Sequence, residues 1–195
     1  MTAPSHAALL LLVLASGCLF RAEAPTRWYE PGSPLLAADD DPPPAATGRP
    51  LRLRSVRAIP FLRERMAWRT SPVESGLYEQ RRWRRMPATY VEEALRAELE
   101  RTPGIRLTDD AHAPALRVEV LAFDEVLRPR RAALVTVRAS LADAGAAGLD
   151  RTFSAEEPLA DADPAAIADA MGAALGAVVT QVAQATSAAL PSRPR

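Results

Sequence analysis

The sequence has few of the side chains that most often carry catalysis: two His and one Cys among 195 residues, and no Lys. A Ser, Cys or Thr nucleophile usually needs an adjacent base, most often a His. Beyond the first few residues the chain offers only His112, in Asp109–Pro114, a segment typical of a solvated loop. The scarcity argues against a nucleophile–His site, and we predict that the protein is not an enzyme.

Metal and nucleotide sites are equally poorly supplied. The neighbouring acids Asp109–Asp110 and Asp124–Glu125 lack the spacing of a calcium-binding loop, and no cluster of His and Cys offers zinc ligands. Paired acids of this kind are usually turn residues. The sequence also has no glycine-rich phosphate-binding loop. We therefore predict no metal and no cofactor, and expect any ATP hydrolysis to be carried out by a partner.

The N-terminal stretch predicts export and lipid attachment. An apolar run from Ala7 to Leu14 is too short to span a membrane, and it is followed by small residues at 15–17 and by Cys18, which resembles a bacterial lipobox. We predict a signal peptide over residues 1–17, a covalent lipid on Cys18, and anchoring on the periplasmic face of a membrane. The alternative, an ordinary signal peptide before an incidental cysteine, would leave a lone thiol in an oxidising compartment.

A Pro-rich segment follows the cysteine. Residues 18–48 are rich in Pro, Ala and Asp, centred on Asp39–Pro44, and such a composition cannot bury enough apolar surface to fold alone. We predict a tether, which at about thirty residues could reach on the order of 100 Å when fully extended. Arg27–Tyr29 brings two aromatic residues into this segment, and the alternative for that part is a short edge strand docked on the folded domain.

The folded domain is predicted over residues 49–190, with a tail at 191–195. Alternating apolar and polar residues indicate strands, and apolar residues at helical spacing indicate two helices. Asp163 is a good N-cap for the second helix, with Pro164 at its first position. The order predicts an α/β (α+β) sandwich, with both helices on one face of a mixed sheet. The expected strands are 51–56, 63–70, 77–83, 116–120, 135–141 and 149–153, and the expected helices run from Pro87 to before Pro103 and from 164 to 190.

The positive charge is concentrated in one part of the chain. The formal net charge is zero, but residues 49–85 contain 11 Arg against 3 Glu. Arg81–Arg85, with Trp83 between the arginines, is a composition that nucleic-acid-binding surfaces also use. A periplasmic protein meets little nucleic acid, so we predict no nucleic-acid partner. An acidic protein partner, anionic lipid headgroups and a merely solvated strand end stay open as interpretations of this basic element.

A known family shares these features. Leu77–Trp83, then Met86–Pro87, then the helix over Val91–Leu99 resemble the signature of ABC-type transport auxiliary lipoproteins, including the paraquat-inducible protein C type. The resemblance implies an accessory subunit of an intermembrane lipid transport system, which works beside a mammalian-cell-entry type protein and, through it, an ABC permease and ATPase. It also implies outer-membrane sorting, because Leu19 rather than Asp follows the cysteine.

The same resemblance directs attention to three residues as partner-binding candidates: Tyr78, Arg82 and Trp83. The alternative for the two aromatic residues is packing within the sheet, because aromatic side chains on strands more often belong to the core. A second hypothesis for the whole protein is an outer-membrane lipoprotein that activates a peptidoglycan synthase, since such regulators also combine a tether with a small α/β domain. A lipid-modified hydrolase is a third, disfavoured by the lack of catalytic groups. The transported lipid and the formation of a homo-oligomer stay open.

Overall fold

The computed structural model describes residues 24–32, 47–142, 148–159 and 161–191. The predictions for the signal peptide, Cys18, Asp39–Pro44, most of the 144–148 turn and most of the C-terminal tail lie outside the described residues. The elements in chain order are β1 (Arg27–Tyr29), β2 (Arg49–Leu53), β3 (Arg57–Ala58), β4 (Arg65–Ser71), β5 (Glu74–Trp83), α2 (Pro87–Arg101), β6 (Ile105–Leu107), β7 (Ala115–Val126), β8 (Ala132–Ala142), β9 (Asp150–Pro158) and α3 (Pro164–Ala189).

The nine strands form one mixed sheet around β7. On one side β7 pairs antiparallel with β8 along its whole length, and β8 pairs antiparallel with β9. The predicted strands at 116–120, 135–141 and 149–153 are therefore confirmed as consecutive antiparallel neighbours, and the β7–β8 connection contains a cis peptide bond at Arg128–Pro129. On its other side β7 pairs in parallel with three short strands in turn, β2, β3 and β4. β6 extends the sheet beyond β2, and β5 and β1 extend it beyond β4.

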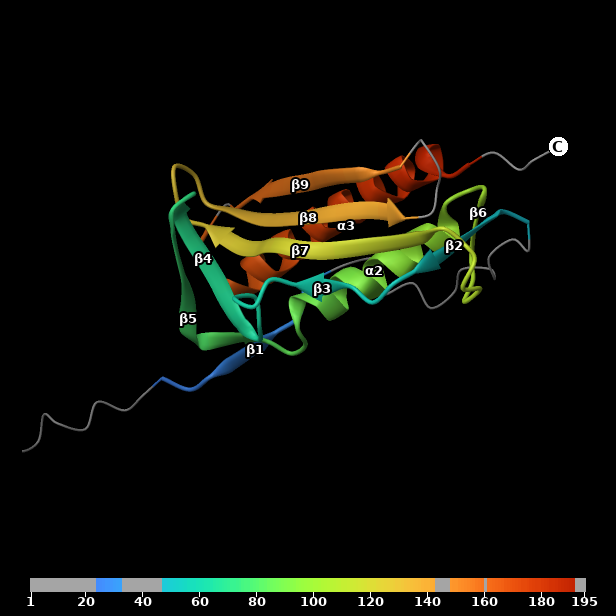
Figure 1. Ribbon diagram of the computed structural model, residues 1–195. Helices are drawn as coiled ribbons and strands as arrows, with labels where there is room; N and C mark the ends of the chain where they lie inside the picture. The colour runs from blue at the N-terminus through green and yellow to red at the C-terminus, as the bar shows by residue number, and fades with distance from the viewer. Residues whose placement is uncertain (1–23, 33–46, 143–147, 160, 192–195) are drawn as a thin grey trace, which may run out of the picture.

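Both helices cover the same face of this sheet, as predicted (Figure 1). α3 packs on β8 and β9, α2 packs on β6, β7 and β3, and the two helices contact each other. Asp163 caps α3 by accepting a hydrogen bond from the Ala165 amide at 3.2 Å. α3 is also long and apolar enough to cross a membrane by length and composition, but 56% of that apolar window is buried in the fold. The opposite face of the sheet carries no helix among the described residues.

The segment Arg27–Tyr29 docks as an edge strand, which is the second of the two alternatives drawn from the sequence. It pairs in parallel with the end of β5, with Tyr29 opposite Trp83. The chain after β1 is held at Gly32, whose amide donates to the Ala168 carbonyl of α3 at 3.1 Å. A β-carbon on Gly172 would overlap the Gly32 backbone, so this close approach requires glycine there. The pairing with β5 and the contact of Gly32 with α3 thus fix the N-terminal segment to the domain.

Candidate partner-binding surfaces

Trp83 lies in the core. Its side chain is 1% exposed, and its ring meets those of Phe123 and Tyr90 edge to face, with centroids 5.3 and 6.3 Å away. Edge-to-face contacts of this kind add to the burial of large apolar rings. The structure therefore places Trp83 where the packing alternative expects it, and a partner cannot touch its ring while the domain is folded.

Tyr78 points into a cluster of charged side chains where β5 lies near the C-terminal half of β7. Its hydroxyl donates a 2.7 Å hydrogen bond to Oε2 of Glu125, a carboxylate that is 1% exposed and also paired with Arg131. The Arg81 guanidinium lies 4.2 Å from the centre of the Tyr78 ring and 3.7 Å from Glu125. Burial, and then the hydrogen bond to Glu125, raise the pKa of Tyr78 to about 12. The hydroxyl is thus committed to an internal acid.

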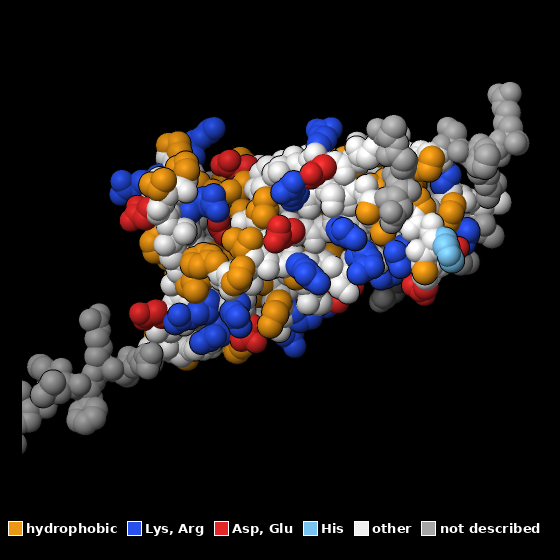
Figure 2. Space-filling model, in the orientation of Figure 1, with side chains coloured by type: hydrophobic (Ala, Val, Ile, Leu, Met, Phe, Trp, Pro, Cys, Tyr) orange, Lys and Arg blue, Asp and Glu red, His pale blue; other side chains and the backbone are white. Residues whose placement is uncertain are grey.

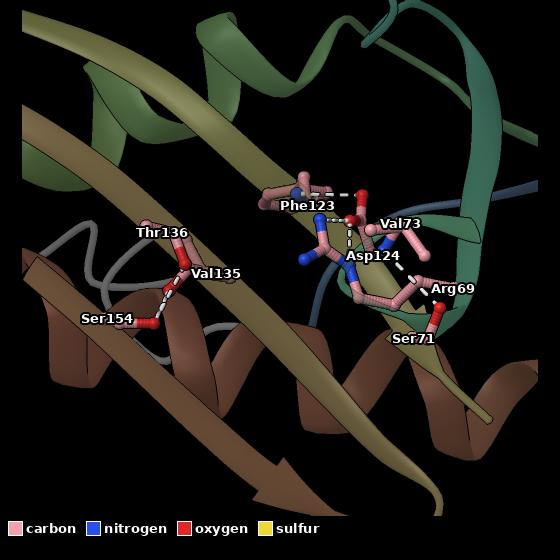
Figure 3. A network of polar contacts seen from close by, with 8 residues as sticks. All are labelled: Arg69, Ser71, Val73, Phe123, Asp124, Val135, Thr136 and Ser154. Atoms are coloured by element: carbon pink, nitrogen blue, oxygen red, sulfur yellow. Dashed lines mark hydrogen bonds and ion pairs between the residues drawn. The ribbon is translucent and has the colours of Figure 1, made fainter. Parts of the chain in front are cut away.

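A second buried acid sits beside the first. Asp124 is 2% exposed and accepts from Arg69 of the neighbouring strand β4, with the Arg69 Nε 2.7 Å from Oδ2 (Figure 3). The Phe123 amide donates to its other oxygen at 3.2 Å. The expectation that Asp124–Glu125 occupies a turn is wrong, because both lie within β7 and each carboxylate is neutralised by arginines reaching in from outside the strand. Such paired buried acids hold structural elements together.

Arg82 lies nearer to the surface. It pairs across the strands with Trp28 of β1 and with Arg65 of β4. Its guanidinium is 5.9 Å from the centre of the Trp28 ring, which is 52% exposed, and 3.9 Å from Glu64. Arg82 is therefore accessible to a partner, whereas Tyr78 and Trp83 turn inward. Of the three predicted residues, Arg82 has a side chain that is 31% exposed, Tyr78 is half-buried with its hydroxyl bonded internally, and Trp83 is buried.

The open face of the sheet holds an arginine-rich groove of about 510 Å³. We call it the arginine groove. Figure 2 looks onto this face, where the blue arginine side chains gather over the part formed by β2, β3 and β7. Its charged lining residues are all exposed. They are Arg54, Arg57, Arg117, Arg138 and Glu119.

The charges in this groove are unevenly paired. Arg138 forms two hydrogen bonds with Asp150, at 2.9 and 2.8 Å, which raise the pKa of Arg138 and lower that of Asp150. For Arg54, Arg57 and Arg117 no ion pair is recorded among the described residues, and Glu119 is the single acid lining the groove. A concave surface with excess positive charge attracts an acidic partner and speeds its association. The groove is therefore a candidate binding surface for an acidic partner.

The sequence carries the signal for this groove, although we did not predict it. Arg117 and Glu119 alternate with buried neighbours along β7, as Arg138 does along β8. That alternation indicates one polar face of the sheet, but which strands bring their charges together depends on the parallel pairing of β2 and β3 with β7. No local pattern contains that pairing.

The remaining candidates from the sequence are metal-binding groups and His112, the lone His in the described part of the chain. No group of three or more His, Cys, Asp and Glu there could hold a metal ion. The His112 side chain is 96% exposed in its loop, 3.2 Å from the carboxylate of Asp110. The backbone amide of His112 donates a 2.9 Å hydrogen bond to the same carboxylate. This bond, and then the contact with the His112 ring, lower the pKa of Asp110. The prediction of a solvated loop at His112 is confirmed.

Comparison with known proteins adds a family and a fold. A family model for the ABC-type transport auxiliary lipoprotein component matches residues 35–183. A crystal structure of protein XCC0632 from Xanthomonas campestris is similar, with a TM-score of 0.66 and 23% identity over 84% of this chain and 96% of that one. A second solved structure, of an uncharacterized protein, has a TM-score of 0.63 and 14% identity over 84% of this chain and 100% of that one. No curated protein sequence matches this chain.

Proposed function

We propose a function for this chain from the fact that it belongs to the ABC-type transport auxiliary lipoprotein family. Membership implies a membrane-anchored protein of the cell envelope that works with an ABC transporter. Within that frame, the chain acts as a periplasmic accessory subunit of an intermembrane lipid transport system, held by a lipid on Cys18. Its direct partner is a mammalian-cell-entry type protein, which connects it to the permease and ATPase.

The observation that supports a binding role is the arginine groove. Three exposed guanidiniums, those of Arg54, Arg57 and Arg117, share an open sheet face with one carboxylate, that of Glu119. Acidic surface on the transport protein would complement this charge, and the attraction between exposed charges would weaken as salt is added. The subunit needs no catalytic group for this task, since it only has to hold the partner near the outer membrane. We therefore propose a non-catalytic binding module.

Site-specific photo-crosslinking in native membranes tests this proposal. Crosslinkers that react with lysine find no lysine side chain in this protein, so a photoreactive amino acid is placed at Ser55 inside the groove. Its control is Glu100, which is exposed on α2, on the helix-covered side. We expect Ser55 to capture a mammalian-cell-entry type protein and Glu100 to capture none. A charge reversal at Arg57 and Arg117 should remove the Ser55 product.

The outcome also separates the two functions drawn from the sequence. Capture of a penicillin-binding protein at Ser55 would overturn the transport role in favour of a peptidoglycan synthase activator. Equal capture at Ser55 and Glu100 would mean that the groove is not the binding surface. Because the family match names transport and not cell-wall synthesis, we favour the first outcome.

A further inference from the structure

The docking of β1 shortens the free chain between the lipid and the domain. Arg27, the first residue of β1, lies only nine positions after Cys18. Fully extended, this stretch spans at most about 30 Å, and a flexible chain of that length averages about 17 Å. A tether of 30 residues would have let the domain stand about 100 Å from the membrane. Because β1 is paired to β5 and Gly32 is held on α3, the end of the domain that carries β1 stays near the bilayer.

The surface around β1 includes exposed apolar and aromatic side chains. Among the described residues four large hydrophobic side chains are strongly exposed, and three of them belong to this end: Trp28 at 52%, Phe61 at 40% and Met86 at 49%. Arg82 contacts both the Trp28 ring and Glu64, which lies in the same loop as Phe61. Met86 lies three residues after Trp83, which pairs with Tyr29 of β1. Tryptophan concentrates at the headgroup level of membranes, where its ring meets both apolar and polar surroundings.

Beside Trp28 lies a polar hollow that suits an anion. Arg65 and Arg82 line it, with Glu79, Gln80 and two residues of the segment leading into β1, Ala24 and Thr26. Nε of Arg65 is buried and has no hydrogen-bond partner among the described residues. The charged residues that line the hollow are thus two arginines and one acid, and guanidinium groups bind phosphate oxygens through charge-assisted hydrogen bonds. Exposed Arg27, next to Trp28, adds a further positive charge.

We propose that this end of the domain, comprising β1, the hollow formed by Arg65 and Arg82, and the exposed Trp28, Phe61 and Met86, rests on the membrane and contacts phospholipid headgroups. The proposal depends on acylation of Cys18, which is part of the proposed function. It assigns the basic strand end to lipid headgroups and leaves the arginine groove, on the open sheet face, to the protein partner. The acyl chain supplies the anchor, and this surface sets the orientation of the domain.

Quenching of tryptophan fluorescence by brominated lipids tests the proposal. The full acylated protein, with the lipid confirmed by mass spectrometry, is reconstituted into vesicles of phosphatidylcholine and phosphatidylglycerol that contain brominated phosphatidylcholine. The wild-type protein should be quenched. Trp28→Phe should reduce the quenching at least threefold, whereas Trp68→Phe should keep it. A wild-type protein that is not quenched, or equal quenching in the Trp28→Phe variant, would overturn the proposal.

A charge variant tests the headgroup contact separately. Arg27→Glu should lower the quenching in vesicles rich in phosphatidylglycerol, while Arg130→Glu, an equally exposed site in the β7–β8 connection, should not. Equal effects of the two variants would show that the hollow end has no special contact with anionic lipid, and would contradict the proposal. If the protein is acylated but its tryptophan fluorescence is not quenched, only the membrane-contact proposal fails and the transport function is unaffected. If mass spectrometry finds no acyl chains on the protein, the lipid anchor on which both proposals depend is absent.

Discussion

The two halves of β7 differ in where their charged side chains lie. Up to Val120 the strand alternates, so that Arg117 and Glu119 are exposed on the open face while their neighbours are buried. A bulge between Val120 and Ala122 then breaks the register with β8. Beyond it four consecutive residues are buried, and two of them are the acids Asp124 and Glu125. One strand thus carries solvent-exposed charge at one end and internally paired charge at the other.

The difference shows that the pairing of a charge, rather than its presence, indicates its role. Arginines from β4, β5 and the β7–β8 connection neutralise the two buried acids, and these contacts attach the β4–β5 ribbon to the main sheet. In the first half, Arg117 has no recorded ion pair among the described residues. We therefore assign the second half to the stability of the fold and the first half to binding, and the following variants test that division.

The largest effect should come from the core residue beneath the second half. Trp83→Ala removes a ring that packs on Phe123 and Tyr90, and should lower the free energy of unfolding by about 3–5 kcal/mol. Urea denaturation followed by circular dichroism measures it. If the variant keeps its stability but loses its partner, Trp83 is an interface residue and its assignment to the core is wrong.

A somewhat smaller loss is expected at the buried acid. Glu125→Gln removes the charge that faces Arg131 and Arg81 while preserving the shape of the side chain, and leaving arginines beside an uncharged buried group should cost about 3 kcal/mol. Glu119→Gln, on the exposed half of the same strand, is the matched control and should change stability by less than about 0.5 kcal/mol. Equal losses of stability in the two variants would contradict the assignment of the two halves of β7 to stability and to binding.

Tyr78→Phe isolates one hydrogen bond of the buried cluster. Its loss should destabilise the protein by about 2 kcal/mol at neutral pH, because the acceptor is a charged carboxylate. The pKa of Tyr78 is raised from its usual 10.0 to about 12, so the stability that this shift contributes is present below pH 10 and is lost as the pH rises toward 12. Unfolding measured between pH 9 and 12 should show a steeper decline in the wild type than in the variant. Parallel curves would disprove the link.

The smallest effect on stability should come from the groove. Arg57→Ala and Arg117→Ala remove exposed side chains without recorded ion pairs, and each should change the free energy of unfolding by less than about 0.5 kcal/mol. Both variants should instead reduce capture of the partner. Capture by the wild-type protein should also decrease as the salt concentration rises, because salt screens exposed charges. A loss of stability comparable to that of Glu125→Gln would mean that the first half of β7 is structural as well.

Most of the fold follows from local sequence patterns. Both helices, the β8–β9 meander and the strands β2, β4 and β5 were predictable because periodicity and turn residues are local properties. β3 and β6, with two and three residues, are too short to show a period. The second half of β7 escaped prediction because the bulge and the buried acids Asp124 and Glu125 break the expected alternation of apolar and polar residues.

The candidate sites were less predictable for a related reason. The aromatic–arginine strand is conspicuous in the sequence, yet Trp83 packs against Phe123 and Tyr90, and the Tyr78 hydroxyl is bonded to Glu125. Those contacts come from α2 and β7, which lie later in the chain. Arg54, Arg57 and Arg117 attract no notice in the sequence, since the first two lie far from Arg117 along the chain. They meet only because β2 and β3 pair with β7, and such long-range pairing leaves no local trace.

The position of β7 in the chain also dictates when the sheet can assemble. β2, β3 and β4 find their parallel partner only about sixty residues later along the chain, since Arg52 lies opposite Ala115 and Ala67 opposite Asp124. Until β7 follows, the edges of these strands that pair with it therefore stay open, although β4 can already pair with β5 and β2 with β6. Pairing at such separation is slow and leaves strand edges open to aggregation. The sheet can therefore be completed only once the middle of the chain is available, and slow refolding from denaturant is the expected consequence.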